Sequence, residues 1–314
     1  MGSLDGKVAV VTGGGRGIGR AVALLLGQEG ASVVVNDLGV ALDGTQPSTG
    51  PAADVAREIH VAGGNAVPNF DDSSTMAGGE ALIQTALQSF GQLDIVVTVA
   101  GILRDRMLFN MSEAEWDDVI RVHLKGHFAV LKPATVLLRQ QRSGRIITFT
   151  SGAGLTGNTG QGNYSAAKGG IAGLTRTLAL EMGRYGVTVN CIAPAALTRM
   201  TASTPESSRA LRAAQGIRPP GSVRLGEPED IAPMVAYLAT DAAGWINGQI
   251  FGVNGGTVFA YATPAPERTI WQPGRWTVSE LAQVVQAQLF SPGWRAPGLP
   301  APQPATPAAS TAGA

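Results

Sequence analysis

Cysteine, charged residues and long apolar runs are all scarce in this sequence. Cys191 is the single cysteine among 314 residues, which excludes an internal disulfide framework and a multi-cysteine metal site, so we expect no bound metal. Charged residues make up 15% of the chain, below the roughly 25% of a typical soluble domain. No apolar run approaches the roughly 18 residues of a membrane span.

Positive and negative charges balance along the chain. Lysine plus arginine and aspartate plus glutamate number 23 each, so the formal net charge is zero. This balance argues against a nucleic-acid partner and against a polybasic membrane-surface protein. The first residues lack the apolar segment of a signal peptide, and the last residues are not a peroxisomal targeting tripeptide. We therefore expect a cytoplasmic protein with no nucleic-acid and no membrane partner, whose ligand is a small molecule.

Short β-branched runs alternate with helical patterns over the first 260 residues. The apolar runs are nearly continuous, which is typical of parallel strands that are covered by helices on both faces. The pattern predicts an α/β fold with a doubly wound parallel sheet, in a single domain spanning residues 1–262. The predicted strands are 8–12, 32–36, 66–69, 95–99, 145–151, 188–193 and 249–253. The predicted helices are 18–29, 52–62, 74–90, 113–141, 164–183 and 229–239.

The composition changes after residue 262. Residues 263–290 form a C-terminal extension in which 276–290 predicts a short helix with one apolar stripe. Residues 291–314 contain six prolines together with alanine, serine and threonine, and we expect this tail to be disordered. Inside the domain, the polar connection 38–51 is unusually long, and we expect 201–225 to be a flexible cover over a substrate.

A glycine-rich turn joins the first predicted strand to the first predicted helix. It reads Gly13-Gly-Gly-Arg-Gly-Ile-Gly19, and such a junction offers backbone N–H groups and the positive end of the helix dipole to an anion. Glycine is required where a side chain would block a pyrophosphate or the packing of helix on strand. The turn therefore indicates a dinucleotide site, with a purely structural turn as the alternative. The candidate binding residues are Gly13, Gly15, Arg16, Gly17, Ile18 and Gly19.

Aspartates follow the next two strands. Asp37 lies 18 residues after Gly19, where a carboxylate accepts hydrogen bonds from both hydroxyls of an adenosine ribose and repels a 2′-phosphate. This position favours NAD over NADP as the cofactor, although Arg16 in the glycine-rich turn favours a phosphate. The alternative role for Asp37 is to cap a turn. Asp71 follows the third strand and is a candidate acceptor for the adenine amino group, or a turn-forming residue.

Tyr164 and Lys168 are spaced to lie on one helical face, one turn apart. A free phenol has a pKa near 10, but an ammonium about 4 Å away, at an effective dielectric near 20, stabilises the phenolate by ~4 kcal/mol, or about three pKa units. We therefore expect Tyr164 to exchange protons near neutral pH. Ser151 ends a predicted strand 13 residues earlier, and the flexible link 152–162 brings its hydroxyl beside the phenol. Two hydroxyls that face one carbonyl oxygen, beside a nicotinamide, form an alcohol/ketone hydride-transfer site.

Together, residues 12–19, Ser151 and the Tyr164/Lys168 pair resemble the short-chain dehydrogenase/reductase family, over about residues 4–260. The resemblance implies a Rossmann fold, a homodimer or homotetramer, and a nicotinamide cofactor. It implies that Tyr164 is the acid and base, that Lys168 lowers its pKa and holds the cofactor ribose, and that Ser151 polarises the substrate oxygen. The further cofactor contacts that it implies are Ala100, Gly101, Pro194, Thr198 and Tyr164 itself.

Four segments, 33–39, 100–106, 122–126 and 192–200, are similar to a narrower group. They resemble the (3R)-hydroxyacyl-CoA dehydrogenase unit of peroxisomal multifunctional enzymes, also called 17β-hydroxysteroid dehydrogenase type 4, and actinobacterial enzymes of steroid side-chain degradation. The resemblance implies NAD-dependent oxidation of a secondary alcohol, a fatty acyl or steroid side-chain 3-hydroxyacyl-CoA, to the ketone. The alternatives are a 17β-hydroxysteroid dehydrogenase, a 3-oxoacyl carrier-protein reductase, and an NAD-binding sensor or scaffold without turnover.

Two positions depart from the family pattern. Thr98-Val99 replaces the asparagine pair that usually precedes the alanine and glycine. His123 stands where many members have an asparagine that relays protons through water to the lysine. We include His123 among the catalytic candidates, with a space-filling role near the cofactor as the alternative.

Overall fold

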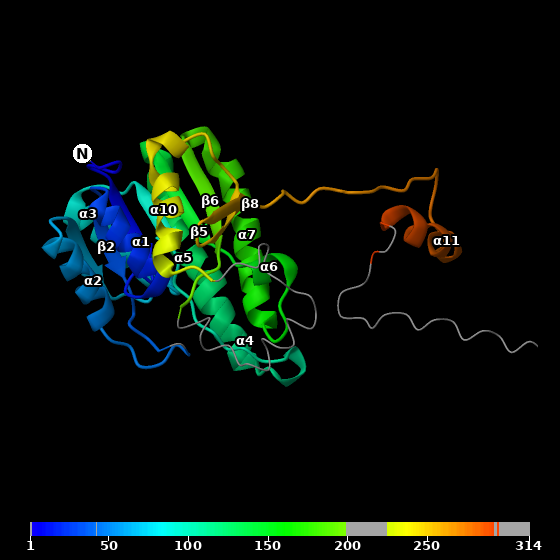
Figure 1. Cartoon of the computed structure of the whole chain (residues 1–314), viewed down its shortest axis with the longest axis horizontal. Helices are drawn as coiled ribbons and strands as arrows, with labels where there is room; N and C mark the ends of the chain where they lie inside the picture. The colour runs from blue at the N-terminus through cyan, green and yellow to red at the C-terminus, as the bar shows by residue number, and fades with distance from the viewer. Residues whose placement is uncertain (1, 42, 199–224, 292–293, 295–314) are drawn as a thin grey trace, which may run out of the picture. The chain divides into compact units, whose positions relative to one another are not determined.

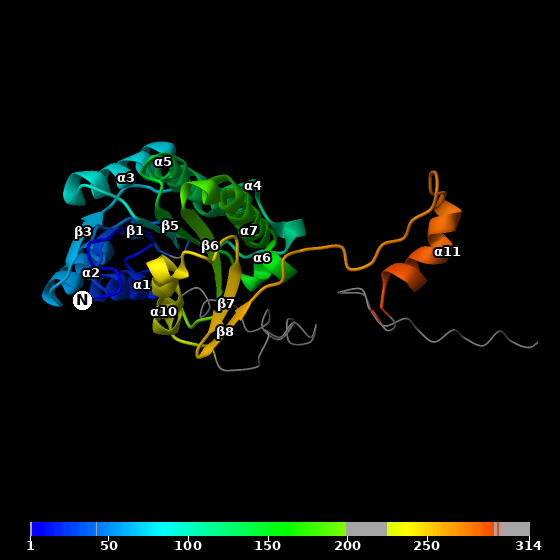
Figure 2. The same cartoon turned by 90° about the horizontal axis from the view of Figure 1, so that it is seen from above.

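The described part of the chain builds one eight-stranded sheet with helices on both faces (Figures 1 and 2). In this computed structural model the described residues are 2–41, 43–198, 225–291 and 294. The strand order is β3-β2-β1-β4-β5-β6-β7-β8, and β8 alone runs antiparallel to its neighbour. The order reverses between β1 and β4, as in doubly wound Rossmann sheets. The predicted fold class is confirmed.

The predicted strands are all present, with small shifts at their ends. The strands are β1 (Val8–Thr12), β2 (Ser32–Asn36), β3 (Asn65–Asn69), β4 (Ile95–Thr98), β5 (Gly144–Phe149), β6 (Val187–Pro194), β7 (Ile250–Asn254) and β8 (Thr257–Ala260). The hairpin strand β8 was not predicted.

The helices also follow the predicted pattern, with two differences. They are α1 (Gly17–Gln28), α2 (Gly50–Val61), α3 (Met76–Phe90), α4 (Glu113–Val119), α5 (Gly126–Gln141), α6 (Gly152–Thr156), α7 (Gly162–Met182) and α10 (Pro228–Ala239). The single helix predicted over 113–141 is interrupted between α4 and α5 by a π-helical segment, η2 (Ile120–Lys125). The link that was expected to be flexible, 152–162, contains the short helix α6.

Both faces of the sheet are buried, which explains the continuous apolar runs. Val11 and Val33 pack in a core with residues of α1, α2 and α10, whereas Val10 and Val34 pack in a second core with residues of α3, α5 and α7. Figure 2 shows these two sets of helices on opposite faces of the sheet. Successive side chains of a strand therefore enter different cores, and neither face is left for solvent.

The register of the parallel strands brings the candidate site residues to one edge of the sheet. Thr12 at the end of β1 pairs with Asn36 at the end of β2 and with Thr98 at the end of β4. Thr98 in turn pairs with Thr148 near the end of β5. The segments that follow these strands, including the glycine-rich turn, are therefore neighbours at the carboxyl edge, where open α/β sheets bind ligands.

The chain divides into two compact units, and among the described residues the first ends at Tyr261. The second contains the short helix expected near 276–290, α11 (Val278–Leu289), which begins with a capping box between Thr277 and Glu280. The cover expected at 201–225 and the disorder expected over 291–314 fall almost entirely on residues outside the described ranges. None of the helices in the described ranges combines the length and the apolarity that crossing a bilayer requires.

Candidate active site

The glycine-rich turn between β1 and α1 is shaped by close backbone contacts. Gly13 has φ +63°, and a Cβ there would lie 2.8 Å from the Cα of Ala100. A Cβ on Gly19 would collide with the carbonyl oxygen of Gly13. The residue that precedes α1, Arg16, supplies no side-chain cap to the helix start. The turn therefore leaves a helix N-terminus for an anion and keeps side chains out of its path.

Asp37 follows β2 and closes over the turn. Its Oδ2 accepts the N–H of Gly15 at 2.9 Å, and its Oδ1 accepts the N–H of Gly39 at 2.7 Å. A Cβ on Gly15 would lie 2.8 Å from Oδ2, so this glycine is what lets the carboxylate approach the turn. The guanidinium of Arg16 donates to the carbonyl oxygen of Val40 at 2.8 Å and thereby anchors the long connection 38–51.

A cavity of about 400 Å³ opens over the turn and includes most of the predicted cofactor residues. Those that line it are Gly13, Arg16, Gly17, Ile18, Gly19, Asp37, Ala100, Gly101 and Thr198. The sequence did not indicate several other lining residues, which are Asn36, Leu38, Val40, Ala41, Gly44, Asp72, Ser73, Ser74, Ile102, Arg121 and Val122. A dinucleotide fits this site for two reasons. The turn provides backbone N–H groups, and its glycines have no side chains that would fill the space of a pyrophosphate.

Five predicted cofactor residues, Gly15, Asp71, Tyr164, Lys168 and Pro194, are not among the described residues that line this cavity. Gly15 packs behind the carboxylate of Asp37. Pro194 ends β6 and is partly buried. Asp71 turns toward the sheet, where its Oδ2 accepts the side-chain amide of Asn69 at 2.7 Å.

Ser151, Tyr164 and Lys168 meet at the carboxyl end of β5. Ser151 caps α6, where its Oγ accepts the N–H of Ala153 at 3.2 Å, and its hydroxyl is hydrogen-bonded to the phenol of Tyr164. Lys168 lies one turn after Tyr164 on α7, is 3% exposed, and has its Nζ 5.7 Å from the centre of the tyrosine ring. The ammonium donates to the carbonyl oxygen of Phe149 at 2.7 Å. The structure therefore brings together the three residues that the spacing had placed in one site.

The pKa of Tyr164 differs from the expectation. Burial raises the pKa of the phenol to about 12, the hydrogen bond with Ser151 lowers it, and the charge of Asp105 raises it. Burial also lowers the pKa of Lys168 to about 8. The prediction that Lys168 brings the pKa of the phenol close to neutral is therefore wrong for the protein's own groups, because burial is the largest influence on the phenol and raises its pKa.

His123 packs between the cavity and Tyr164. Its Nε2 lies 2.8 Å from the carbonyl oxygen and 3.1 Å from the backbone nitrogen of Ile102, a cavity residue. Burial, and next the charge of Lys168, hold its pKa well below the usual value, so the ring is neutral. Gly101 leaves room for it, because a Cβ there would collide with the ring's Cε1. The π-helical segment that carries His123 had no signal in the sequence.

The hydroxyl of Thr12 holds the segment that departs from the family pattern. Its Oγ1 accepts the N–H of Val99 at 3.1 Å and that of Ala100 at 3.3 Å. These bonds tie the end of β4 to the end of β1 without an asparagine at position 98 or 99. Within the described ranges, no cluster of three or more histidine, cysteine, aspartate or glutamate residues is arranged to hold a metal.

A Rossmann sheet with a glycine-rich cavity and a serine–tyrosine–lysine group defines an oxidoreductase that acts on hydroxyl groups. Residues 13–258 match the family model adh_short_C2, described as enoyl-(acyl carrier protein) reductase. The chain belongs to the short-chain dehydrogenase/reductase family, as its motifs predicted. Members of this family use a nicotinamide cofactor and act on small molecules.

Named relatives are similar over most of this chain. Hydroxyacyl-CoA dehydrogenase ChsB1 of Mycobacterium tuberculosis is 43% identical over 88% of this chain and 88% of its own. Peroxisomal multifunctional enzyme type 2 of Mus musculus is 42% identical over 81% of this chain, which corresponds to 32% of the mouse protein. The 3-oxoacyl-[acyl-carrier-protein] reductase of Synechocystis is 43% identical over 82% of this chain and 99% of its own. The resemblance to the multifunctional enzymes is confirmed.

A solved structure shows the same fold. The crystal structure of a short chain dehydrogenase from Mycobacterium avium has a TM-score of 0.80 and 44% identity, and the match covers 95% of this chain and 100% of that one.

Proposed function

We propose that this chain is an NAD-dependent dehydrogenase that oxidises the secondary alcohol of a 3-hydroxyacyl-CoA, with a fatty acyl or steroid side chain, to the ketone. The observation that carries the proposal is the group formed by Ser151, Tyr164 and Lys168 at the same sheet edge as the glycine-lined cavity. The similarity to ChsB1, named as a hydroxyacyl-CoA dehydrogenase, supports the substrate class.

Asp37 and Arg16 support NAD over NADP. The carboxylate of Asp37 lines the cavity beside the turn, where it would accept ribose hydroxyls and repel a 2′-phosphate. The guanidinium of Arg16 is bound to the carbonyl oxygen of Val40, which directs it to the loop instead of to a phosphate. In the sequence, Asp37 favours NAD and Arg16 favours a phosphate. The position of the Arg16 guanidinium supports NAD as the cofactor.

Tyr164 is the proton acceptor of the proposed reaction, and Ser151 orients the substrate oxygen. Bound NAD, in its oxidised form, would supply both the hydride acceptor and a positive charge beside the phenol. Because burial keeps the phenol protonated, Tyr164 takes the hydroxyl proton only where positive charge stabilises the phenolate. Lys168 contributes one such charge from its position below the ring. Neutral His123 packs edge-on against the phenol and helps to fix its orientation.

The second candidate is a 3-oxoacyl carrier-protein reductase. The Synechocystis relative and the description of the family model favour it. That reaction would use the reduced, phosphorylated cofactor, which the carboxylate of Asp37 disfavours. A 17β-hydroxysteroid dehydrogenase and a sensor without turnover are the other candidates, and the complete serine–tyrosine–lysine group argues against the sensor.

Steady-state kinetics separate these candidates. The full chain is assayed for reduction of NAD and NADP with 3-hydroxyacyl-CoA thioesters and 17β-hydroxysteroids, and for oxidation of NADPH with 3-oxoacyl carrier proteins. We expect the highest kcat/KM with NAD and a 3-hydroxyacyl-CoA. Higher kcat/KM with a steroid or with a carrier-protein substrate would replace the proposal, and NAD binding without turnover would favour the sensor. Light scattering tests the homodimer or homotetramer that we also propose.

A further inference from the structure

The side chain of Asn163 is fully buried at the start of α7, one residue before Tyr164. Its Nδ2 donates to the carbonyl oxygen of Arg104 at 3.0 Å and to that of Glu115 at 2.9 Å. Its Oδ1 accepts the backbone N–H of Tyr164 at 2.7 Å. Sequence reasoning had not indicated Asn163, because the two carbonyl partners lie 59 and 48 residues away in the chain. One buried amide therefore joins the backbone of Tyr164 to two distant segments.

The N–H of Tyr164 needs such a partner because of its place in the helix. It belongs to the first turn of α7, where N–H groups find no carbonyl oxygen within the helix. The residue that precedes α7, Gln161, provides no side-chain cap, and its amide nitrogen donates instead to Asp105 at 2.9 Å. Asn163 thus supplies the acceptor that the helix start lacks, and its loss would leave this N–H without the hydrogen bond.

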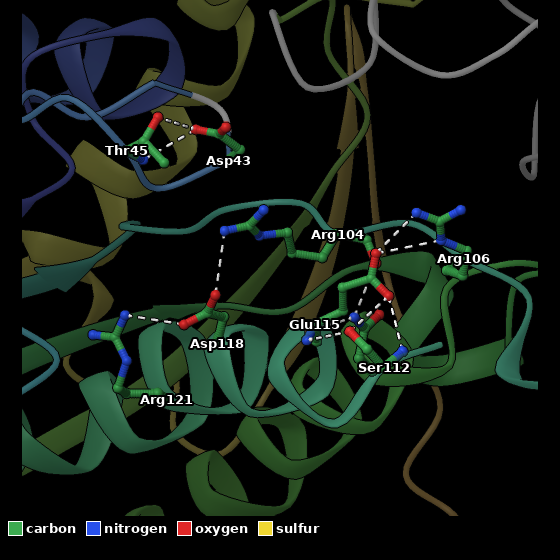
Figure 3. Close-up of polar contacts among 9 residues, drawn as sticks. Asp43, Thr45, Arg104, Arg106, Ser112, Glu115, Asp118 and Arg121 are labelled. Carbon is green, nitrogen blue, oxygen red and sulfur yellow. Dashed lines mark hydrogen bonds and ion pairs between the residues drawn. The ribbon is translucent and has the colours of Figure 1, made fainter. Parts of the chain in front are cut away.

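The two carbonyl oxygens that receive the amide belong to a braced part of the chain. Arg104 pairs with Asp118 at 3.2 Å, and Arg106 pairs with Glu115 at 3.1 Å. Figure 3 shows both guanidinium groups reaching these carboxylates, which α4 carries. Glu115 also completes the capping box at the start of α4. The segment after β4 and the helix α4 are therefore tied together, and the amide binds one carbonyl oxygen of each.

The segment after β4 also carries part of the wall of the cofactor cavity. Residues 100–102 line the cavity and lead directly into the segment that Asn163 binds. His123 contacts the backbone of Ile102 and meets the ring of Tyr164 edge-on. Tyr164 is therefore linked to this wall twice, through its ring by His123 and through its backbone by Asn163.

We propose that Asn163 is a positioning residue that fixes the phenol of Tyr164 relative to the cofactor cavity by holding the backbone of the tyrosine. The proposal rests on the proposed function, in which Tyr164 accepts the proton of the substrate hydroxyl. Because its side chain is fully buried, Asn163 does not touch the substrate. Proton transfer requires the phenol within a hydrogen bond of that hydroxyl, and a displacement of about 1 Å lowers the rate by roughly 10²-fold.

Asn163→Ala removes the three hydrogen bonds of the amide, and Asn190→Ala is the matched control. Asn190 is 1% exposed on β6, where its amide donates to the carbonyl oxygen of Ile246 at 2.8 Å and accepts the N–H of Gln249 at 3.0 Å. Each variant loses one buried amide that bridges backbone groups, so both should unfold at a lower urea concentration than the native protein. A difference in rate between them therefore reports on position and not on stability.

The rates are measured on the full chain, below the unfolding transition, with the cofactor and substrate that give the highest kcat/KM. We expect hydride transfer in a single turnover to slow at least tenfold in Asn163→Ala, while the Kd of the cofactor stays within twofold of the native value. Asn190→Ala should keep the native rate. Asn163→Asp preserves the shape and the acceptor for the N–H of Tyr164 but loses at least one donor, so its rate should lie between those of the native protein and Asn163→Ala. This variant carries the test if Asn163→Ala does not fold.

Fluorine NMR provides a measurement that needs no turnover. 3-Fluorotyrosine is incorporated at the four tyrosines, and the signal that is absent from Tyr164→Phe identifies Tyr164. This signal should shift or broaden in Asn163→Ala and stay unchanged in Asn190→Ala. A native rate of hydride transfer or an unmoved Tyr164 signal in Asn163→Ala would overturn the proposal, and so would equal losses of rate in the two alanine variants. If the native chain turns over no substrate, the proposed function fails, and the fluorine signal still decides the role of Asn163.

Discussion

The ring of His123 occupies the space that a side chain at Gly101 would need, since a Cβ on Gly101 would collide with Cε1 of the imidazole. The same ring meets the phenol of Tyr164 edge-on, with ring centres 5.2 Å apart and an angle of 89° between the rings. The absence of a side chain at Gly101 and the orientation of Tyr164 are therefore linked through one buried histidine.

Gly101→Ala should lower the free energy of unfolding by about 1–3 kcal/mol, the usual cost of overpacking a filled site. In the His123→Asn background the colliding ring is gone, so the same alanine should cost at least ~1 kcal/mol less. Urea unfolding of the four proteins of this cycle measures the coupling. Gly173→Ala on α7 is the control, because no atom lies within 4 Å of its Cβ position. Equal costs of Gly101→Ala in both backgrounds would contradict the link.

Tyr164→Phe should retain NAD binding and lose turnover. The ring still packs against His123, but the hydroxyl that exchanges the proton is gone, and general acid–base catalysis is worth roughly 10²–10⁴-fold. The measurements are NADH fluorescence for binding and initial rates for kcat. Tyr237→Phe, at an exposed position on α10, should behave as the native protein. Residual kcat above a tenth of the native value would remove Tyr164 from the proton-transfer step.

Asp37→Asn should shift cofactor preference toward NADP. The amide oxygen keeps an acceptor for a backbone N–H of the turn, so the local fold is preserved while the negative charge is removed. We expect the ratio of kcat/KM for NAD to that for NADP to fall roughly tenfold or more, because the repulsion of a 2′-phosphate is lost. An unchanged ratio would show that Asp37 only closes the turn.

The sequence predicted the strands well because parallel strands that are buried on both faces appear as continuous apolar runs. It missed β8, a four-residue edge strand whose side chains are mostly exposed, although its last three residues are apolar. It also missed the π-helical segment, because the helical pattern continues through 113–141 and the extra residue in the turn is visible only in three dimensions.

Local spacing was enough to propose the reacting groups, but it did not indicate the residues that hold them in place. Tyr164 and Lys168 are four residues apart, and the glycine-rich turn is contiguous, so each is visible as a motif. The buried side-chain amide of Asn163, which precedes Tyr164, donates to the carbonyl oxygens of Arg104 and Glu115. Such contacts between distant segments leave no periodic pattern in the sequence. The error in the pKa of Tyr164 has a related cause, since the charge of Lys168 is evident from spacing and the burial of the phenol is not.

Lys168→Met should abolish turnover and yet stabilise the fold at pH 7. Burial lowers the pKa of Lys168 from 10.5 to about 8, which corresponds to a cost of about 3 kcal/mol for holding the ammonium in the folded state. Methionine avoids this cost but leaves the carbonyl oxygen of Phe149 without its donor, at about 1–2 kcal/mol. The expected net gain is about 1–2 kcal/mol in the free energy of unfolding, measured in urea.

The pH dependence of that gain provides the decisive check. Below pH 8, folded and unfolded chains both carry the ammonium, so the full cost of burying it applies to the native protein. Between pH 8 and 10.5, the folded chain has lost the proton and the unfolded chain retains it, so the stability of the native protein rises with pH and the advantage of methionine disappears. Lys132→Met, at an exposed position on α5, should show no such trend. A stability difference between Lys168→Met and the native protein that is constant from pH 7 to 10.5 would mean that Lys168 keeps an ordinary pKa in the folded chain.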